Sequence, residues 1–227
     1  MRVWTGIWSR GTPAKEGIDV FVTHLGHACL LVQTERARIL IDPGTMSEFE
    51  GLRDLDAVLV THQHGDHLDT ARLGALLAAN DGATLVVDPD TASTIADLPE
   101  HTVVRPGDTL SFGSTRVDVR GGLHAAVYAD VPGCTNCAYL IDDGALFHPG
   151  DSFFVPEDDV DVLAVAIDGP WLKVSEAVDY VHAVSPRIAV PIHEGETTDP
   201  AKYSGLLAAF SPAGVVTGLT SGKQTKL

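Results

Sequence analysis

The sequence predicts an α+β protein in which amphipathic helices cover β-sheets. Short apolar runs rich in β-branched residues, typical of strands, dominate residues 20–60 and 103–147. Apolar residues at helical spacing follow the first of these stretches and return twice near the end of the chain. Of the 227 residues, 44% are hydrophobic, which suffices for one large core, and neither a linker nor a repeat interrupts them. We therefore expect a single domain over residues 1–227.

Residues 1–17 fit this pattern least and form an atypical N-terminal extension. They contain no continuous apolar segment, so we expect neither a secretory signal nor a membrane anchor. The stretch at residues 3–8 contains two tryptophans. It suits an additional edge strand, an association surface between copies of the chain, or a mobile tail, and these alternatives stay open.

The strand-rich first part ends with the apolar run AVLV at residues 57–60, which predicts a buried strand. A helix is expected soon after it, because Asp69 suits an N-cap and the apolar residues that follow have helical spacing until about residue 80. Strands then alternate with a short helix after Asp90.

Two helices are expected to close the chain. The first spans about residues 174–184, and its buried stripe is formed by Val174, Ala177, Val178 and Val181. The second has Asp199 as its N-cap and Pro200 at its first position. Its apolar face is formed by Tyr203, Leu206, Leu207 and Phe210.

Directly after the strand at residues 57–60 stands the run THQHGDH, which holds three of the ten histidines. Neutral imidazole and carboxylate groups are ligands that zinc and similar divalent metals accept. The alternation of the strand points His62 and His64 the same way, and the glycine after them lets Asp66 and His67 approach from another direction. So short a loop can hardly close round one tetrahedral ion, which favours two metals.

Each of the two metals would then need further ligands from distant parts of the chain. Three candidates, His124, Asp151 and His193, each follow a strand-like apolar run. They therefore lie where strands give way to loops, as the cluster at residues 61–67 does.

With these residues the chain resembles the metallo-β-lactamase superfamily of binuclear metal hydrolases. The resemblance rests on a Thr-His-x-His-x-Asp-His motif followed by a separate histidine, aspartate and histidine, and it covers nearly the whole chain. It implies a four-layer αββα sandwich with mostly antiparallel sheets and the metals at one edge. Asp42, at the end of an apolar run, matches a further element of the superfamily.

The resemblance also implies a division of the ligands between two metals. One metal would be held by His62, His64 and His124. The second would be held by Asp66, His67 and His193, with Asp151 bridging both. Within the superfamily, the segments THLGHA at residues 23–28 and GDSF at residues 150–153 look most like the ascorbate-phosphate lactonase-like branch.

The expected chemistry is hydrolysis by a metal-bound hydroxide that bridges the two ions. Zn²⁺ is the first expectation for the metals, and the ligand types leave Mn²⁺ and Ni²⁺ open. Asp66 is expected both to bind a metal and to orient the nucleophile. His27 and His148 are expected either to orient ligands or, beside a metal-bound water, to protonate the leaving group. The substrate is expected to be a small ester, lactone or phosphodiester, with anionic substrates included.

Other classes of protein are less favoured. The net charge of −16 and the lack of a basic run disfavour nucleic-acid binding and hence a nuclease. A di-iron redox protein is disfavoured because such superfamily members, by resemblance, carry glutamate where His64 stands. A metal-binding protein without turnover is a third alternative.

Two histidines, a tryptophan and three cysteines lie outside the motifs described above. His101 and His182 are taken as ordinary surface or partly buried histidines, and Trp171 either lines the substrate pocket or packs against a helix. Cys29, Cys134 and Cys137 are taken as unpaired thiols rather than a zinc or redox motif. Their odd number, together with the lack of a signal segment, favours the cytoplasm.

Overall fold

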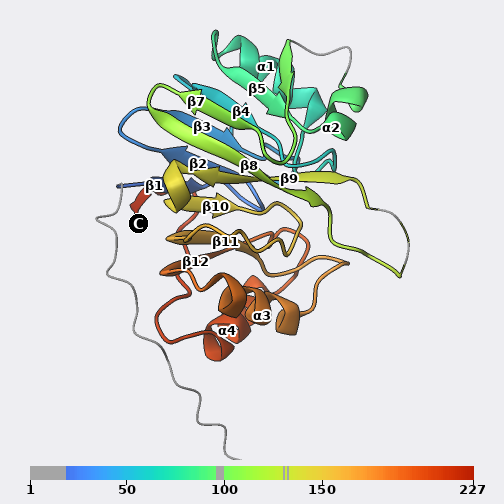
Figure 1. Cartoon of the computed structure of the whole chain (residues 1–227), viewed down its shortest axis with the longest axis vertical. Coiled ribbons are helices and arrows are strands. Elements are labelled where there is room, and N and C mark those ends of the chain that lie inside the picture. Colours follow the sequence, from blue (N-terminus) through green and yellow to red (C-terminus); the bar gives the residue numbers. More distant parts are fainter. Residues whose placement is uncertain (1–18, 96–99, 130, 132) are drawn as a thin grey trace, which may run out of the picture.

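The computed structural model describes residues 19–95, 100–129, 131 and 133–227, and it confirms the αββα sandwich. Helices α1 (Thr70–Ala78) and α2 (Pro89–Thr94) lie on the outer side of one sheet, and α3 (Val174–Val184) and α4 (Pro200–Phe210) lie on the outer side of the other (Figure 1). The predictions for the N-terminal extension fall outside the described residues.

Within the described ranges, the first sheet has seven strands in the order β13-β1-β2-β3-β4-β5-β6. These are β1 (Phe21–His24), β2 (Leu30–Gln33), β3 (Arg38–Ile41), β4 (Ala57–Leu59), β5 (Thr84–Val87), β6 (His101–Val103) and β13 (Thr225–Lys226). The second sheet has the order β12-β11-β10-β9-β8-β7. Its members are β7 (Thr109–Phe112), β8 (Thr115–Leu123), β9 (Thr135–Ile141), β10 (Leu146–His148), β11 (Val162–Ala166) and β12 (Ile188–Ile192), with a 3-10 turn at Asp142–Gly144.

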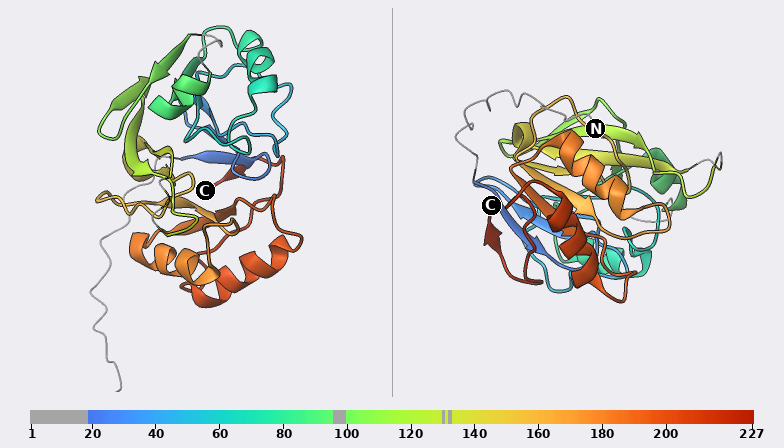
Figure 2. Two further views of the ribbon diagram at one scale, coloured as in Figure 1. Left: turned by 90° about the vertical axis from the view of Figure 1, so that its right-hand side faces the viewer. Right: turned by 90° about the horizontal axis from the view of Figure 1, so that it is seen from below.

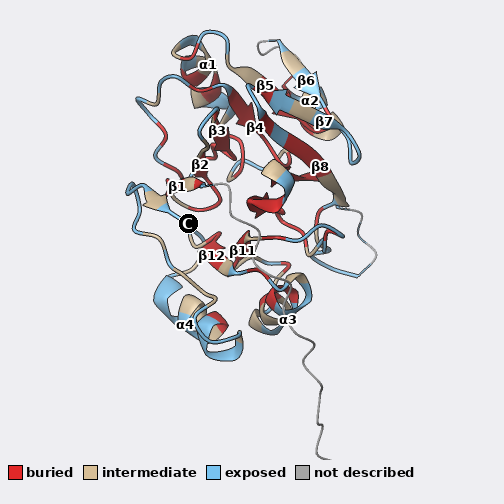
Figure 3. Cartoon of the chain, turned by 60° about the vertical axis from the view of Figure 1, so that its left-hand side comes forward, coloured by how far each residue is buried: buried red, intermediate tan, exposed pale blue. Residues whose placement is uncertain are grey.

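Alternation along the strands fills an apolar layer on each side of each sheet. In β3, Ile39 and Ile41 belong to the core between the sheets, whereas Leu40 belongs to the core under α1. In β11, Leu163 packs in the core under α3 and α4. Figure 3 shows this burial on the strands, with exposed outer faces on the helices. The near-continuous apolar runs in the sequence reflect strands that are buried on both faces.

The predicted helices all form, and their start signals are confirmed. Asp69 caps α1 by accepting hydrogen bonds from two backbone amides, and the Asp199 carboxylate caps α4 in the same way at Lys202. The short helix α2 begins slightly earlier than expected, after the N-cap Asp88. None of the helices in the described part of the chain is long and apolar enough to cross a membrane.

The buried faces of the two closing helices differ from the predicted stripes. In α3 the buried residues are Ala177, Tyr180 and Val181. Tyr180 was not included in the predicted apolar stripe because its hydroxyl is polar. In the structure the side chain is buried and the hydroxyl donates to the carbonyl of Phe154. The prediction for Phe210 was wrong, since its side chain is 64% exposed. Helices α3 and α4 lie side by side and together cover the outer face of the second sheet (Figure 2). Because α3 covers part of this face, α4 buries one residue, Leu207.

Strands that run parallel have their carboxyl ends at the same edge of the sheet, so several strand ends lie next to one another. Strands β3, β4 and β5 run parallel, as do β10, β11 and β12. Strand β8 has the direction of β10 because both pair antiparallel with β9. The sheets meet where the Cys137 amide donates to the Thr61 carbonyl across 2.8 Å, just beyond β4. The loops that carry the predicted ligands therefore leave the two sheets next to one another.

Candidate metal centre

The structure brings all the predicted ligands into two adjoining groups at this edge. One group consists of His62, His64, His124 and Asp151, and the other of His27, Asp66, His67 and His193. Within each group the ligand atoms lie within 4.8 Å of one another. Apart from His27, this is the division expected from the sequence.

Asp151 lies between the two groups. One carboxylate oxygen is 3.1 Å from Nε2 of His67, and the other is 3.2 Å from Nε2 of His193 and 3.3 Å from Nε2 of His124. A single carboxylate therefore faces histidines of both groups, which is the arrangement that a bridging ligand requires.

Hydrogen bonds on Nδ1 fix three histidines so that Nε2 is directed inward. His67 donates from Nδ1 to Asp42 across 2.7 Å, and His124 donates from Nδ1 to the carbonyl of Ala125 across 2.6 Å. The Thr61 hydroxyl donates to Asp42 and so accepts from Nδ1 of His62 across 3.0 Å. With the proton on Nδ1, each Nε2 keeps the lone pair that binds a metal.

Unpartnered buried atoms provide an independent test of whether a metal fits. Nε2 of His67, Nε2 of His193 and Oδ1 of Asp151 are buried and have no hydrogen-bond partner among the described residues. Buried polar atoms are rarely left in this state, because desolvation is costly. All three are metal-binding atoms that converge on one place, so the residues fit divalent cations.

The charges of the site agree with this fit. Burial lowers the pKa of His67, but the carboxylates of Asp151 and Asp42 outweigh it and hold that pKa well above its usual value. The carboxylates of Asp151 and Asp66 likewise outweigh burial and raise the pKa of His193 to about 9. In contrast, burial holds the pKa of His62 well below its usual value and keeps that imidazole neutral. The carboxylates thus create a strong demand for positive charge.

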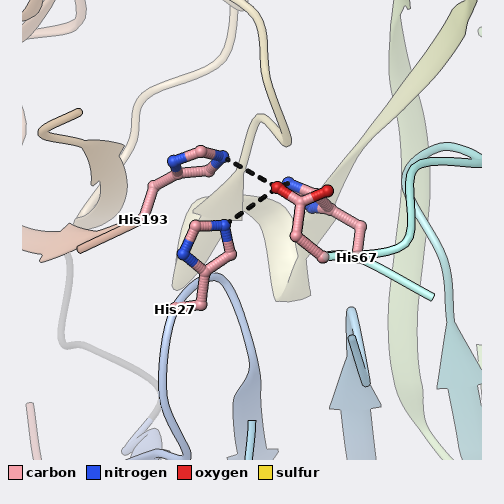
Figure 4. Close-up of side chains that lie close together, drawn as sticks. His27, His67 and His193 are labelled. Carbon is pink, nitrogen blue, oxygen red and sulfur yellow. Dashed lines mark hydrogen bonds and ion pairs between the residues drawn. The ribbon is translucent and has the colours of Figure 1, made fainter. Parts of the chain in front are cut away.

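His27 belongs to the second group but has the opposite proton arrangement. Its Nδ1 accepts a hydrogen bond from the Gly195 amide across 3.0 Å, so the ring proton stands on Nε2. From there it donates to Oδ2 of Asp66 across 3.0 Å. Figure 4 shows the rings of His27, His67 and His193 turned toward one another. His27 therefore orients Asp66 and does not offer a lone pair to a metal.

His148 does not have the geometry of a proton donor to a substrate. Its ring is fully buried, Nε2 donates to the carbonyl of Ala28, and Nδ1 accepts from the amide of Gly150. Both nitrogens are therefore engaged with the backbone, and of the two roles expected for His148 this geometry favours orientation of a ligand over protonation of a leaving group. His148 holds the loop that carries Asp151.

Two residues that support Asp151 were not recognised as such from the sequence. The Trp171 indole donates to Oδ2 of Asp151 across 3.1 Å, and the Asn136 amide oxygen accepts from the Asp151 backbone amide across 3.0 Å. Trp171 is thus placed beside the site rather than only against a helix. Its position after an apolar strand was the available signal, whereas Asn136 carried none beyond its place in the run CTNC.

His182 and the three cysteines lie outside the two groups. His182 donates to the carbonyl of Phe210 at the surface. The three cysteines are free thiols, and burial raises the pKa of Cys137 to about 12 and that of Cys134 to about 11, so both stay protonated. Neither belongs to a metal-binding group in the described ranges.

The backbone of the centre is strained at three positions. His27, Asp42 and His193 have φ angles of 53°, 51° and 64°, in the left-handed region that side chains rarely adopt. His27 and His193 are also joined through their backbones, because the His193 amide donates to the His27 carbonyl across 2.9 Å. The three residues turn sharply out of their strands or loops to aim their side chains at the centre.

Asp42 gives a test of how far the centre depends on its supporting groups. We expect Asp42→Asn to weaken metal binding about 10- to 100-fold. The carboxylate accepts from His67 and the Thr61 hydroxyl through one oxygen and from the Thr61 backbone amide through the other, whereas an amide side chain has one accepting oxygen. Competition with a chromophoric chelator measures the effect. Asp56→Asn, at the start of β4, is the matched control, since Asp56 only accepts from the Arg38 amide at the surface. Equal metal affinity of the two variants would contradict the role given to Asp42.

Comparison with known proteins places this fold and site in one class. The model of the "Beta-lactamase superfamily domain" matches residues 21–193, so the chain belongs to the metallo-β-lactamase superfamily. The solved structure of Igni18, a metallo hydrolase from Ignicoccus hospitalis, covers 92% of this chain and 98% of its own, with a TM-score of 0.72 and 19% identity.

Relatives narrow the class to one family. Protein Rv0786c of Mycobacterium tuberculosis is 45% identical over 84% of this chain and 92% of its own length. A UPF0173 protein of Pyrococcus furiosus is 34% identical over 78% of this chain and 86% of its own. A relative in Carboxydothermus hydrogenoformans, 28% identical over 76% of this chain and 83% of its own, is named a UPF0173 metal-dependent hydrolase. The chain is a member of the UPF0173 family and a metal-dependent hydrolase.

Proposed function

We propose that the protein hydrolyses an ester, lactone or phosphodiester bond in a small molecule at a binuclear metal centre. His62, His64 and His124 would hold one ion, and Asp66, His67 and His193 would hold the other. Asp151 would bridge the two. The observation that carries this proposal is the Asp151 carboxylate, which faces histidines of both groups while one of its buried oxygens lacks a hydrogen-bond partner. Zn²⁺ is the metal we propose first, with Mn²⁺ or Ni²⁺ as alternatives.

Bound divalent ions would supply Lewis acidity and lower the pKa of a coordinated water from about 16 toward about 7. The chain's own groups prepare the place for that water. Burial raises the pKa of Asp66, but the nearby imidazoles of His193 and His27 outweigh burial and hold that pKa below its usual value, so this carboxylate stays ionised near neutral pH. It therefore remains an acceptor that can orient a water molecule. His27 acts through Asp66 and is a positioning residue.

Among these bonds, we propose that the protein hydrolyses those of lactones and simple esters first. This rests on the segments at residues 23–28 and 150–153, which look most like the ascorbate-phosphate lactonase-like branch. We also propose that the partners are small molecules rather than nucleic acids, in line with the net charge of −16. The three free thiols of the protein support the proposal that it works in a reducing compartment such as the cytoplasm.

Metal content measured together with turnover tests the proposal. Mass spectrometry of the purified protein should find about two equivalents of divalent metal per chain. Panels of lactones, phosphodiesters and thioesters should reveal hydrolysis that a chelator abolishes and added metal restores. Bound iron with oxygen consumption would favour the redox alternative, and two metals without turnover on any panel would favour a non-catalytic metal-binding protein.

His64 tests the division of ligands between the two ions. We expect His64→Ala to lose the first metal selectively, so that one equivalent remains tightly bound, because His64 lies near His62 and His124 and not in the second group. Isothermal titration of the metal-free protein counts the sites. His182→Ala is the control, since this histidine bonds only to the end of α4. Equal weakening of both sites would refute the assignment.

A further inference from the structure

A cleft of about 650 Å³ adjoins the candidate metal centre. Trp171 forms part of its wall and donates to Asp151. Ala125 forms another part, and its amide donates to the Asp151 carbonyl across 2.7 Å while its carbonyl accepts from His124. The cleft and the first metal group therefore share a wall, and a molecule whose reacting bond lies at the metals can extend into the cleft.

The lining of the cleft is apolar and almost uncharged. Aromatic and small side chains dominate it, among them Phe153, Phe154 and Ala126. Among the described lining residues Glu176 is the ionisable one, and its carboxylate accepts from the Lys173 amide at the start of α3. No lysine or arginine among these residues lines the cleft. An anionic group would meet a carboxylate there and no compensating cation.

Exposed apolar residues continue along the chain from the lining residues Leu123 and Ala126. Leu123, Val127 and Tyr128 follow one another closely at the end of β8 and in the next loop, and they are 72%, 56% and 75% exposed. Neighbouring apolar side chains that stay exposed beside a concave site are typical of ligand binding. The volume of the cleft also lies within the range of small-molecule sites, about 300–1,000 Å³.

We infer that this cleft binds the uncharged hydrocarbon group of the substrate, so that the hydrolase prefers neutral, apolar esters or lactones over anionic ones. The inference rests on the proposed function for the reaction and on the cleft alone for the choice of substrate. It narrows the expectation from the sequence, which included anionic substrates.

Binding of neutral and anionic fluorescent probes to the intact protein tests the cleft without any turnover. N-phenyl-1-naphthylamine, which is uncharged, should bind at one site. The anionic probe 1-anilinonaphthalene-8-sulfonate should bind at least about tenfold more weakly. Ala126→Glu should reduce binding of the neutral probe about tenfold or more, because it introduces a charge at an exposed position of the cleft wall. Ala208→Glu, the same change at an exposed position of α4, should leave binding unchanged.

Kinetics on straight-chain esters provides the second measurement. Each added methylene should raise kcat/KM about two- to fourfold until the cleft is filled, the upper value corresponding to complete burial. Phe154→Ala should flatten this dependence, whereas Phe210→Ala, an exposed phenylalanine on α4, should not.

The two proposals fail in different ways. Probe binding that is insensitive to Ala126→Glu, or preference for the anionic probe, would overturn the assignment of the cleft even in an active hydrolase. Binding that follows the prediction in a protein with no esterase, lactonase or phosphodiesterase activity would support the cleft and overturn the reaction.

Discussion

Asp151→Asn is expected to abolish the proposed binuclear centre and to lower kcat/KM by about 10²- to 10³-fold, the order found when a group that stabilises transition-state charge is removed. The Asp151 carboxylate lies within 3.3 Å of three histidine nitrogens that belong to both groups. An amide keeps the shape but supplies one neutral oxygen and a donor, so it cannot bridge two cations. Metal content should fall from two equivalents toward one or none.

The control for this variant is Asp161→Asn. Asp161 pairs with Arg187 at the surface, just before β11 and at the opposite end of that strand from the metal-centre edge. Surface ion pairs contribute little, about 0–1 kcal/mol, so this variant should keep its metal and its activity. An Asp151→Asn protein that retains two tightly bound metals would remove the bridging role. Stability measured in the presence of chelator separates loss of metal from loss of fold.

Gly44→Ala is expected to destabilise the protein by about 3 kcal/mol or more, at the upper end of the cost of overpacking. A Cβ atom on Gly44 would lie 1.6 Å from the Asp66 carbonyl oxygen and 2.7 Å from the His67 amide nitrogen. Both are backbone atoms, so no side chain can swing away. The loops after β3 and β4 would have to separate, and Asp66 and His67 would be displaced.

Gly74→Ala provides the matched control for this substitution. Gly74 lies in α1, where an added Cβ meets nothing within 4 Å. Alanine is the better helix former there by about 1 kcal/mol, so this variant should be slightly more stable than the parent. Urea unfolding of both variants, together with chelator competition for their metals, measures the contrast. If Gly44→Ala kept the parent's stability and metal affinity, the close approach of these loops would have no structural importance.

Sequence was most informative where the signal is local. Asp69 and Asp199 were recognisable as helix caps because a cap needs only its next few residues. The ligands at residues 62–67 were recognisable for the same reason, since their spacing and types are read from one loop. The four layers came from resemblance rather than from periodicity, because strands buried on both faces carry no alternation.

What sequence missed depends on contacts between distant segments. Trp171 stands 20 residues after Asp151, and only the folded chain brings its indole to that carboxylate. The tautomer of His27 is set by the amide of Gly195, which lies 168 positions away. His148 was expected either to orient a ligand or to protonate the leaving group, and its partners are backbone groups that no sequence pattern indicates. The types of the residues were thus readable, and their proton positions were not.

The left-handed backbone conformations of His27, Asp42 and His193 are unfavourable for folding, although the side chains of these residues serve the metal centre. Each such conformation costs of order 1 kcal/mol or more for a residue with a side chain. Glycine would relieve that cost at any of the three positions, but it would also delete the imidazole or carboxylate that the centre needs. At Asp42 the buried donors of Thr61 and His67 would also lose their acceptor, at about 1–3 kcal/mol each, so glycine there would lower the stability as well as the metal affinity.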